Sequence, residues 1–174
     1  EKSLKSENLK IHETGNISRE KPDEYSRGNI DEGFEQSELI IEDTFTTQIA
    51  IQNPTEVHCS VVNWEGEKLK IWDSTQGIFE VRNSIAKSLG LKEENVQVIK
   101  EYMGGGFGSK LEAGKYTLMA AISSKKLNRP VKIVLDRKEM NLAVGNRPDS
   151  KQTLKLVFKK DGTILALSHN SIAN

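Results

Sequence analysis

The sequence has little of what marks several classes of protein. Its one cysteine, Cys59, excludes a disulfide framework within the chain and a cysteine-rich metal site. Its longest apolar runs are too short to span a bilayer. Its first ten residues, EKSLKSENLK, are charged and lack the apolar core of a signal peptide. We therefore expect a cytoplasmic protein with no membrane partner.

The sequence also lacks an excess of either charge. Its 25 lysine and arginine residues balance its 25 aspartate and glutamate residues, which gives no electrostatic reason to expect nucleic acid as a partner. A length of 174 residues suffices for one domain with a core. The middle of the chain contains no proline- and serine-rich linker and no internal repeat. We expect a polar, extended leader over residues 1–35 and a single domain over residues 36–174.

Two segments have the apolar spacing of helices. In residues 77–90, Val81, Ile85 and Leu89 fall on one face, and Gly90 stands where the helix would end. Residues 110–127 predict a second helix that is mostly buried. This burial is predicted from its apolar residues Leu118, Met119, Ala121 and Ile122.

Alternating apolar and polar residues predict strands between and around these helices. The expected strands cover residues 38–47, 56–64, 68–74, 95–102 and 129–136. A helical turn is expected over residues 137–145, and a long hairpin over residues 152–170 turns at Asp161-Gly162. Because hairpins flank one β-α-β core, we predict an α+β fold, a mixed sheet with hairpins and two main helices.

The stretch EYMGGGFGSK, residues 101–110, lies between a predicted strand and a predicted helix. Glycines permit close approach of a ligand, and the start of a helix favours an anion. Two phosphate motifs fail, because Leu111 stands where a P-loop needs Ser or Thr, and Ser109 stands where a dinucleotide fingerprint needs Gly. A loop that only lets the following helix pack against its neighbours remains the alternative.

Two motifs together carry a family resemblance. DSTQG at residues 73–77 and MGGGFGSK at residues 103–110 are separated by a predicted helix and strand. They are flanked by NPTEVHCSVVNWEGEKLKIW and NRPVKIVLDRKEMNLAVGNRP. In these motifs the chain resembles the molybdopterin-binding large subunit of the xanthine dehydrogenase/aldehyde oxidoreductase family, which includes molybdenum carbon monoxide dehydrogenases. The resemblance covers roughly residues 15–174 and implies part of a molybdenum cofactor-binding domain.

The resemblance implies a set of cofactor contacts. Gln76 would direct its amide at the apical oxo ligand of molybdenum, and Gly105, Gly106, Phe107 and Gly108 would bring the loop backbone to the molybdopterin. Phe107 would also wall the substrate pocket. No residue of this chain would ligate the metal directly. The alternatives are that Gln76 only caps a helix and that Phe107 belongs to the core.

Three residues near these motifs have simpler readings from the sequence. Lys110 is expected to support the loop or to be solvated. His58 is expected to be a packed, hydrogen-bonded structural histidine. Glu56 is expected to hold the predicted hairpin or its neighbours.

The resemblance also implies what the chain does not contain. The general-base glutamate of the family lies in a GxGE-type segment, and no such segment occurs here, so no catalytic residue is assigned. We expect an internal piece of a larger oxidoreductase subunit that does not turn over alone. Iron–sulfur clusters and FAD would lie on other subunits or domains, and the substrate would be a small molecule. The alternative is a non-catalytic binding or assembly domain that kept the fold.

Overall fold

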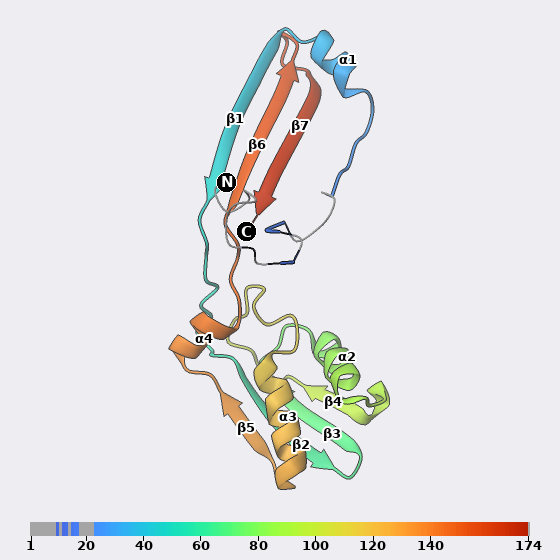
Figure 1. The fold of residues 1–174 in the computed structure, drawn as a ribbon, viewed down its shortest axis with the longest axis vertical. Helices are drawn as coiled ribbons and strands as arrows, with labels where there is room; N and C mark the ends of the chain where they lie inside the picture. Colours follow the sequence, from blue (N-terminus) through green and yellow to red (C-terminus); the bar gives the residue numbers. More distant parts are fainter. Residues whose placement is uncertain (1–9, 11, 14, 18–22, 174) are drawn as a thin grey trace. The chain divides into compact units, whose positions relative to one another are not determined.

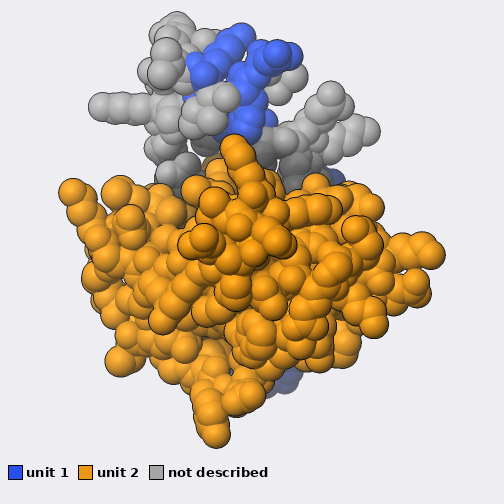
Figure 2. Space-filling view, turned by 90° about the horizontal axis from the view of Figure 1, so that it is seen from below, with its two compact units in different colours: residues 1–43, 153–170 blue, residues 44–152, 171–174 orange. Residues whose placement is uncertain are grey.

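The structure is a computed structural model that describes residues 10, 12–13, 15–17 and 23–173. The described residues form two compact units, distinguished by colour in Figure 2. One unit takes in residues up to 43 together with 153–170, and the other takes in residues 44–152 and those from 171 onward. Part of the leader expected over residues 1–35 lies outside the described residues, and the domain boundary after residue 35 stays a prediction.

A three-stranded sheet contains β1 (Leu39–Thr47), β6 (Ser150–Phe158) and β7 (Ile164–Ala173), in the order β1-β6-β7 (Figure 1). The hairpin expected over residues 152–170 is therefore present. Its turn places Gly162 at φ +86°, a conformation that favours glycine.

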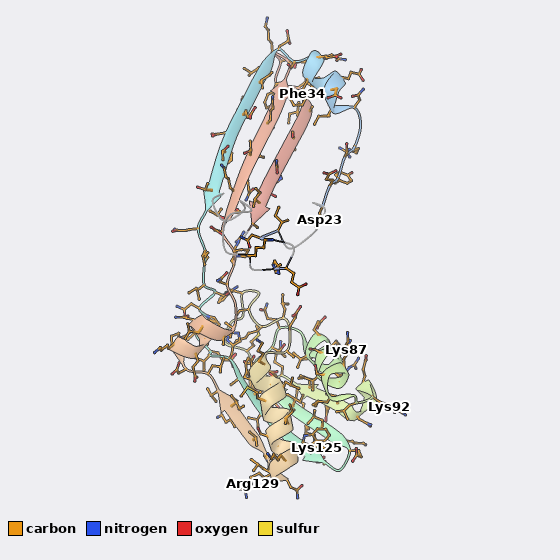
Figure 3. The ribbon with its side chains drawn as sticks, viewed as in Figure 1. Asp23, Phe34, Lys87, Lys92, Lys125 and Arg129 are labelled. Carbon is orange, nitrogen blue, oxygen red and sulfur yellow. The ribbon has the colours of Figure 1, made fainter. Side chains whose placement is uncertain are left out.

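The short helix α1 (Ile30–Glu35) belongs to the same unit as most of β6 and β7. Its N-cap residue is Asn29, whose side chain accepts a hydrogen bond from Glu32 N at 3.3 Å. Its Phe34 ring lies 4.9 Å from Lys155 Nζ, and Figure 3 labels this phenylalanine.

A four-stranded mixed sheet, in the order β4-β3-β2-β5, forms the centre of the second unit. The strand β2 (Cys59–Glu65) is antiparallel to both β3 (Lys68–Asp73) and β5 (Val131–Val134), whereas β3 is parallel to β4 (Val96–Ile99). Because β3 and β4 are parallel, they end at the same edge of the sheet. The chain leaves β3 into the STQ segment (residues 74–76) and leaves β4 toward the glycine loop (residues 104–110).

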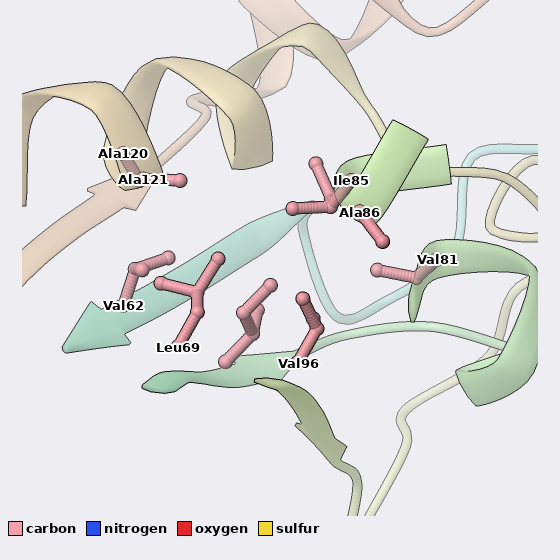
Figure 4. Packing of buried hydrophobic residues seen from close by; sticks show 9 residues of the cluster. Val62, Leu69, Val81, Ile85, Ala86, Val96, Ala120 and Ala121 are labelled. Atoms are coloured by element: carbon pink, nitrogen blue, oxygen red, sulfur yellow. The ribbon is translucent and has the colours of Figure 1, made fainter. Parts of the chain in front are cut away.

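Two helices pack on this sheet and enclose the core with it. The helix α3 (Lys115–Leu127) contacts β2 and β5, and α2 (Ile78–Leu89) contacts β4. Apolar side chains from the strands point toward those of the two helices in Figure 4. The cluster consists of Val62, Leu69, Ile71, Val81, Ile85, Ala86, Val96, Ala120 and Ala121. Burial of this apolar surface is the main favourable contribution to the folding of the unit.

The helix α2 agrees with its sequence pattern. Val81 and Ile85 are buried, Leu89 packs against the cluster, and Gly90 ends the helix at φ +65°. A 3-10 turn, η2 (Glu93–Asn95), then leads into β4.

The helix α3 differs from its prediction in two ways. It begins at Lys115 instead of residue 110, because the backbone of Lys110 is hydrogen-bonded to the STQ segment. Two residues predicted to contribute to its burial, Met119 and Ile122, are 60% and 52% exposed. The buried face instead carries two alanines and three residues with hydroxyl groups, of which Thr117 hydrogen-bonds to Ser60 and Asp73 of the sheet. The buried residues are Tyr116, Thr117, Ala120, Ala121 and Ser124.

The expected helical turn after β5 is the helix α4 (Arg137–Ala143), which begins with a capping box between Asp136 and Glu139. Its Arg137 donates to Pro54 O at 2.6 Å and to Thr55 O at 3.1 Å, and so anchors the segment before β2. None of the helices in the described part of the chain is both long and apolar enough to cross a membrane.

Candidate functional site

Gln76 reaches the glycine loop from the end of β3. Its side-chain Oε1 accepts hydrogen bonds from Gly108 N at 2.8 Å and from Lys110 N at 3.4 Å. Its backbone N–H donates to Lys110 O at 2.7 Å. Since two backbone N–H donors meet the same side-chain atom, that atom must be the amide oxygen. The Nε2 group of Gln76 donates no hydrogen bond to any described residue, so it remains available as a donor.

Two of the loop glycines are explained by contacts within the chain. A Cβ on Gly106 would overlap the side chain of Gln76, and a Cβ on Gly104 would lie 2.6 Å from Glu56 Cβ. Two others are explained by backbone conformation, because Gly105 and Gly108 have φ values of +96° and +90°. The run of glycines is therefore required by the loop itself, and does not by itself indicate a ligand.

Phe107 stands at the tip of the loop. It adopts φ +51°, which is uncommon for a residue with a side chain. Its side chain is 70% exposed, so the alternative that it belongs to the core does not hold in this chain. The backbone N–H groups of Gly105, Gly106 and Phe107 donate no hydrogen bond to any described residue.

Lys110 and Glu56 form an ion pair beside the loop, in which only the lysine is fully buried. Lys110 Nζ lies 2.7 Å from Glu56 Oε2 and 3.0 Å from Glu56 O. The lysine side chain is fully buried, whereas the glutamate side chain is 31% exposed. Burial acts to raise the pKa of Glu56, but hydrogen bonds from Lys110 and Gly104 and the lysine charge together hold that pKa below its ordinary value.

His58 forms a further hydrogen bond to the C-terminal end of the loop, at Ser109. It is 1% exposed, and its Nε2 lies 3.0 Å from Ser109 O. Since a carbonyl oxygen can only accept, Nε2 carries the proton. Burial lowers the pKa of His58 below its ordinary value, and the nearby Lys110 charge acts in the same direction. The sequence-based reading of His58 as a packed, hydrogen-bonded histidine agrees with this geometry.

A buried carboxylate lies at the end of β3, directly before the STQ segment. Asp73 is 6% exposed, and its Oδ2 accepts from Thr117 Oγ1 at 3.0 Å. The same hydroxyl lies 2.8 Å from Ser60 Oγ. Burial raises the pKa of Asp73 to about 6, although the hydrogen bonds from Thr117 and Ser60 act to lower it. Burial also raises the pKa of the neighbouring Tyr116.

Two clefts adjoin the loop within the second unit. One, of about 370 Å³, is lined by His58, Gly108, Ser109 and the start of α3. The other, of about 380 Å³, is lined by Phe107 and residues 50–52 with Arg147. A larger cleft of about 570 Å³ lies beside β3, β4 and α2 and contains none of the predicted site residues. Phe107 lines the second of these clefts, and Gln76 lines none of the three.

The structure thus brings together all five residues predicted to contact a cofactor, since Gln76 is bonded to the loop of residues 105–108. The described residues contain no group of three or more His, Cys, Asp or Glu side chains placed to hold a metal ion. Sequence reasoning missed the hydrogen bonds of Thr117 and Ser60 around Asp73, and the anchoring role of Arg137. No local pattern in the sequence signalled these contacts, because Ser60 and Thr117 lie 57 positions apart and Arg137 and Pro54 lie 83 positions apart.

Comparison with known proteins identifies the family. The model of the molybdopterin cofactor-binding domain family matches residues 11–174. The aldehyde oxidoreductase molybdenum-binding subunit PaoC of Escherichia coli O157:H7 is 37% identical over 144 residues, which are 83% of this chain and 20% of PaoC. The probable hypoxanthine oxidase XdhD of Escherichia coli K12 is 37% identical over 147 residues, which are 84% of this chain and 15% of XdhD. The chain therefore spans 20% or less of the length of these curated relatives.

Solved structures agree with the sequence comparison. Quinoline 2-oxidoreductase from Pseudomonas putida 86 superposes with a TM-score of 0.74 at 28% identity, over 84% of this chain and 19% of that protein. Aldehyde oxidoreductase from Desulfovibrio gigas shares the fold with a TM-score of 0.77 at 22% identity, over 84% of this chain and 16% of that protein. The predicted fold class and the resemblance carried by the two motifs are thereby confirmed, and the chain belongs to the molybdopterin cofactor-binding domain family.

Proposed function

We propose that this chain contributes Gln76 and the loop residues Gly105, Gly106, Phe107 and Gly108 to molybdopterin binding in a molybdenum-dependent oxidoreductase. The family supports the cofactor, and the similarity to the oxidoreductase subunit PaoC and the probable oxidase XdhD supports the reaction class. The residue assignments rest on the loop geometry of this chain.

The orientation of the Gln76 amide carries the proposal. Its oxygen is held by Gly108 N and Lys110 N, so its Nε2 group is directed away from these donors with a hydrogen to give. The unpaired N–H groups of Gly105, Gly106 and Phe107 add further donors on the same loop. This donor set fits a group that is rich in acceptor atoms. Gly108 takes part by holding Gln76, because its own N–H is already used within the chain.

Each part of the loop has a separate task in this proposal. Molybdopterin, when bound, supplies the redox chemistry, and the protein supplies neutral hydrogen bonds that orient it without replacing its ligands. Gln76 and the loop backbone provide those hydrogen bonds. Phe107, exposed at the loop tip, excludes water from one side of the site and walls the substrate pocket.

The remaining parts of the proposal concern the larger assembly. We infer that other polypeptide segments complete the cofactor site, and that iron–sulfur and FAD-carrying subunits or domains accept the electrons. The 174 residues alone are expected to show no turnover, because no catalytic glutamate segment is present in them. Oxidation of an aldehyde by the purified chain, with a dye as electron acceptor, would contradict that expectation.

The proposal is tested by the molybdenum content of the chain isolated with its partners from its source cells. We expect molybdenum and the pterin together with partner polypeptides. Gln76→Ala should lower the molybdenum per chain several-fold. Gln97→Ala changes an exposed glutamine on β4 and should leave the molybdenum content unchanged.

Two results would count against the proposal. Equal molybdenum in the Gln76→Ala and wild-type proteins would remove Gln76 from the site. A wild-type chain without molybdenum, pterin or partners would favour a non-catalytic binding or assembly domain. That alternative has one supporting observation, since contacts within the chain already explain Gly104 and Gly106.

A further inference from the structure

We propose that Glu56 and Lys110 are positioning residues for the Gln76 amide, acting as a clasp that closes the glycine loop. Only the effect of this clasp on cofactor binding rests on the proposed function. Neither residue is assigned a contact with the cofactor. The clasp itself is a property of this chain and can be tested without any cofactor.

The first step is that one residue holds both ends of the loop. Glu56 N donates to Gly104 O at 3.1 Å, and Glu56 Oε2 accepts from Gly104 N at 3.1 Å. The same Oε2 atom accepts from Lys110 Nζ at 2.7 Å, and Glu56 O accepts from that ammonium at 3.0 Å. Residues 104 and 110 are therefore joined through Glu56.

The second step is that Lys110 connects this clasp to Gln76. Its backbone N–H donates to Gln76 Oε1 at 3.4 Å, and its carbonyl accepts from Gln76 N at 2.7 Å and from Thr75 Oγ1 at 3.0 Å. Glu56 has no recorded contact with Gln76. Any influence of Glu56 on the orientation of that amide must therefore pass through the loop.

The third step is the burial of the lysine. The Lys110 side chain is fully buried, whereas the lysine of the exposed pair Lys70–Glu65 is 31% exposed. A buried ammonium that loses its charged partner is strongly unfavourable, so the Glu56 carboxylate stabilises Lys110 in this buried position. An exposed pair imposes no comparable restraint on its surroundings.

A purely structural role is the competing explanation, and the two roles predict different behaviour. If the pair only stabilises the fold, replacing both charges by neutral side chains should restore stability and loop order together. If the pair positions the loop, the double replacement should recover stability but not loop order. Loop order should not recover because the double variant has no ammonium at position 110 to bond to residue 56.

The experiment uses the full 174-residue chain labelled with ¹⁵N. The variants are Glu56→Gln, Lys110→Met and the double variant, with Lys70→Met as the control at an exposed pair. The readouts are hydrogen exchange of the Gly108 amide, the chemical shifts of the Gln76 side-chain amide, and Tm. Exchange of Gly108 reports the hydrogen bond to Gln76 that the clasp is proposed to maintain.

We expect Gly108 to exchange at least tenfold faster in both single variants and in the double variant, with the Gln76 amide signal shifted. The double variant should recover much of the Tm lost in the single variants, and the Lys70→Met control should match the wild type. Unchanged Gly108 exchange in folded variants would overturn the proposal. So would recovery of Gly108 protection together with Tm in the double variant.

Failure of all three variants to fold would also overturn the proposal, because the pair would then serve the fold as a whole. These results are separate from those for the proposed function. The clasp is read from the signals of the cofactor-free chain, whereas molybdopterin binding is read from the molybdenum content of Gln76→Ala.

Discussion

The four-stranded sheet and the three-stranded sheet differ in how their strands are buried. In β3, the alternate residues Leu69, Ile71 and Asp73 are 1%, 0% and 6% exposed. All nine residues of β1, by contrast, are exposed. The first sheet is covered on one face by two long helices, α2 and α3, whereas the unit that holds most of the second sheet contributes the six-residue helix α1. The STQ segment and the glycine loop thus emerge from the sheet that has its own core.

The largest expected effect comes from truncating a buried isoleucine on the four-stranded sheet, compared with an exposed isoleucine on the three-stranded sheet. Ile71→Ala, at a fully buried position, should lower the free energy of unfolding by about 2–5 kcal/mol, because it removes apolar contacts and leaves a cavity. Ile41→Ala, at a position that is 50% exposed, should cost less than about 1 kcal/mol. Urea unfolding followed by tryptophan fluorescence measures the first effect directly, since both tryptophans, Trp64 and Trp72, lie in β2 and β3.

The Ile41→Ala variant needs a probe on its own sheet, for which hydrogen exchange of the β1 and β6 amides is suitable. If Ile41→Ala destabilises β1 as strongly as Ile71→Ala destabilises β3, the proposed difference between the sheets is wrong. In that case the exposed side chains of β1 must be covered in solution.

The second effect concerns the buried carboxylate of the four-stranded sheet. The pKa of Asp73 is about 6 in the folded chain against an ordinary value of 3.8, so the folded state binds more protons than the unfolded state between these values. Stability from Asp73 is therefore fully present below about pH 4 and is lost as the pH rises through 6. A pKa difference of roughly two corresponds to about 3 kcal/mol.

We expect Asp73→Asn to be more stable than the wild type at pH 8, by up to about 3 kcal/mol, with the difference shrinking as the pH falls to 4. Urea midpoints of both proteins across this range provide the measurement. His58, whose pKa is lowered, contributes the opposite slope, but that contribution is common to both proteins and cancels in the comparison. A stability difference that does not change with pH would show that Asp73 is not the titrating group.

These results show which parts of the molecule the sequence could predict. The spacing of Val81 and Ile85 identified α2, because a helix with one apolar stripe has an unambiguous period. The start of α3 was misplaced by five residues, because Lys110 forms hydrogen bonds with a segment more than 30 positions away. Local spacing contains no information about such a distant partner.

The candidate site also contains features that the sequence could predict and features that it could not. The STQ and glycine motifs could be paired from the sequence by resemblance, and their proximity could be expected from two parallel strands. The burial of Lys110 could not be expected, since a lysine among glycines is ordinarily solvated. Its burial depends on Glu56, which lies 54 positions earlier in the chain.

The smallest effect compares a glycine of the loop after β4 with a glycine of the β6–β7 turn. Gly106→Ala places a Cβ against the Gln76 side chain, so we expect a loss of about 1–3 kcal/mol from forced displacement of that side chain. Gly162→Ala, in the β6–β7 turn, meets no atom within 4 Å, but its φ of +86° should cost about 1–2 kcal/mol in backbone strain. Calorimetry measures the stability of both variants.

The signal of the Gly108 amide distinguishes the two glycine variants most clearly. Gly106→Ala should shift the Gly108 amide signal, because Gln76 Oε1 can no longer hold that amide in its present position. Gly162→Ala should leave this signal unchanged while altering the Lys159 amide, which donates to Thr163 O, and the Thr163 amide, which donates to Asp161 Oδ1. If Gly106→Ala left the Gly108 signal in place, Gln76 would have room to move aside without losing the loop. The close contact between Gly106 and Gln76 would then not fix the amide orientation.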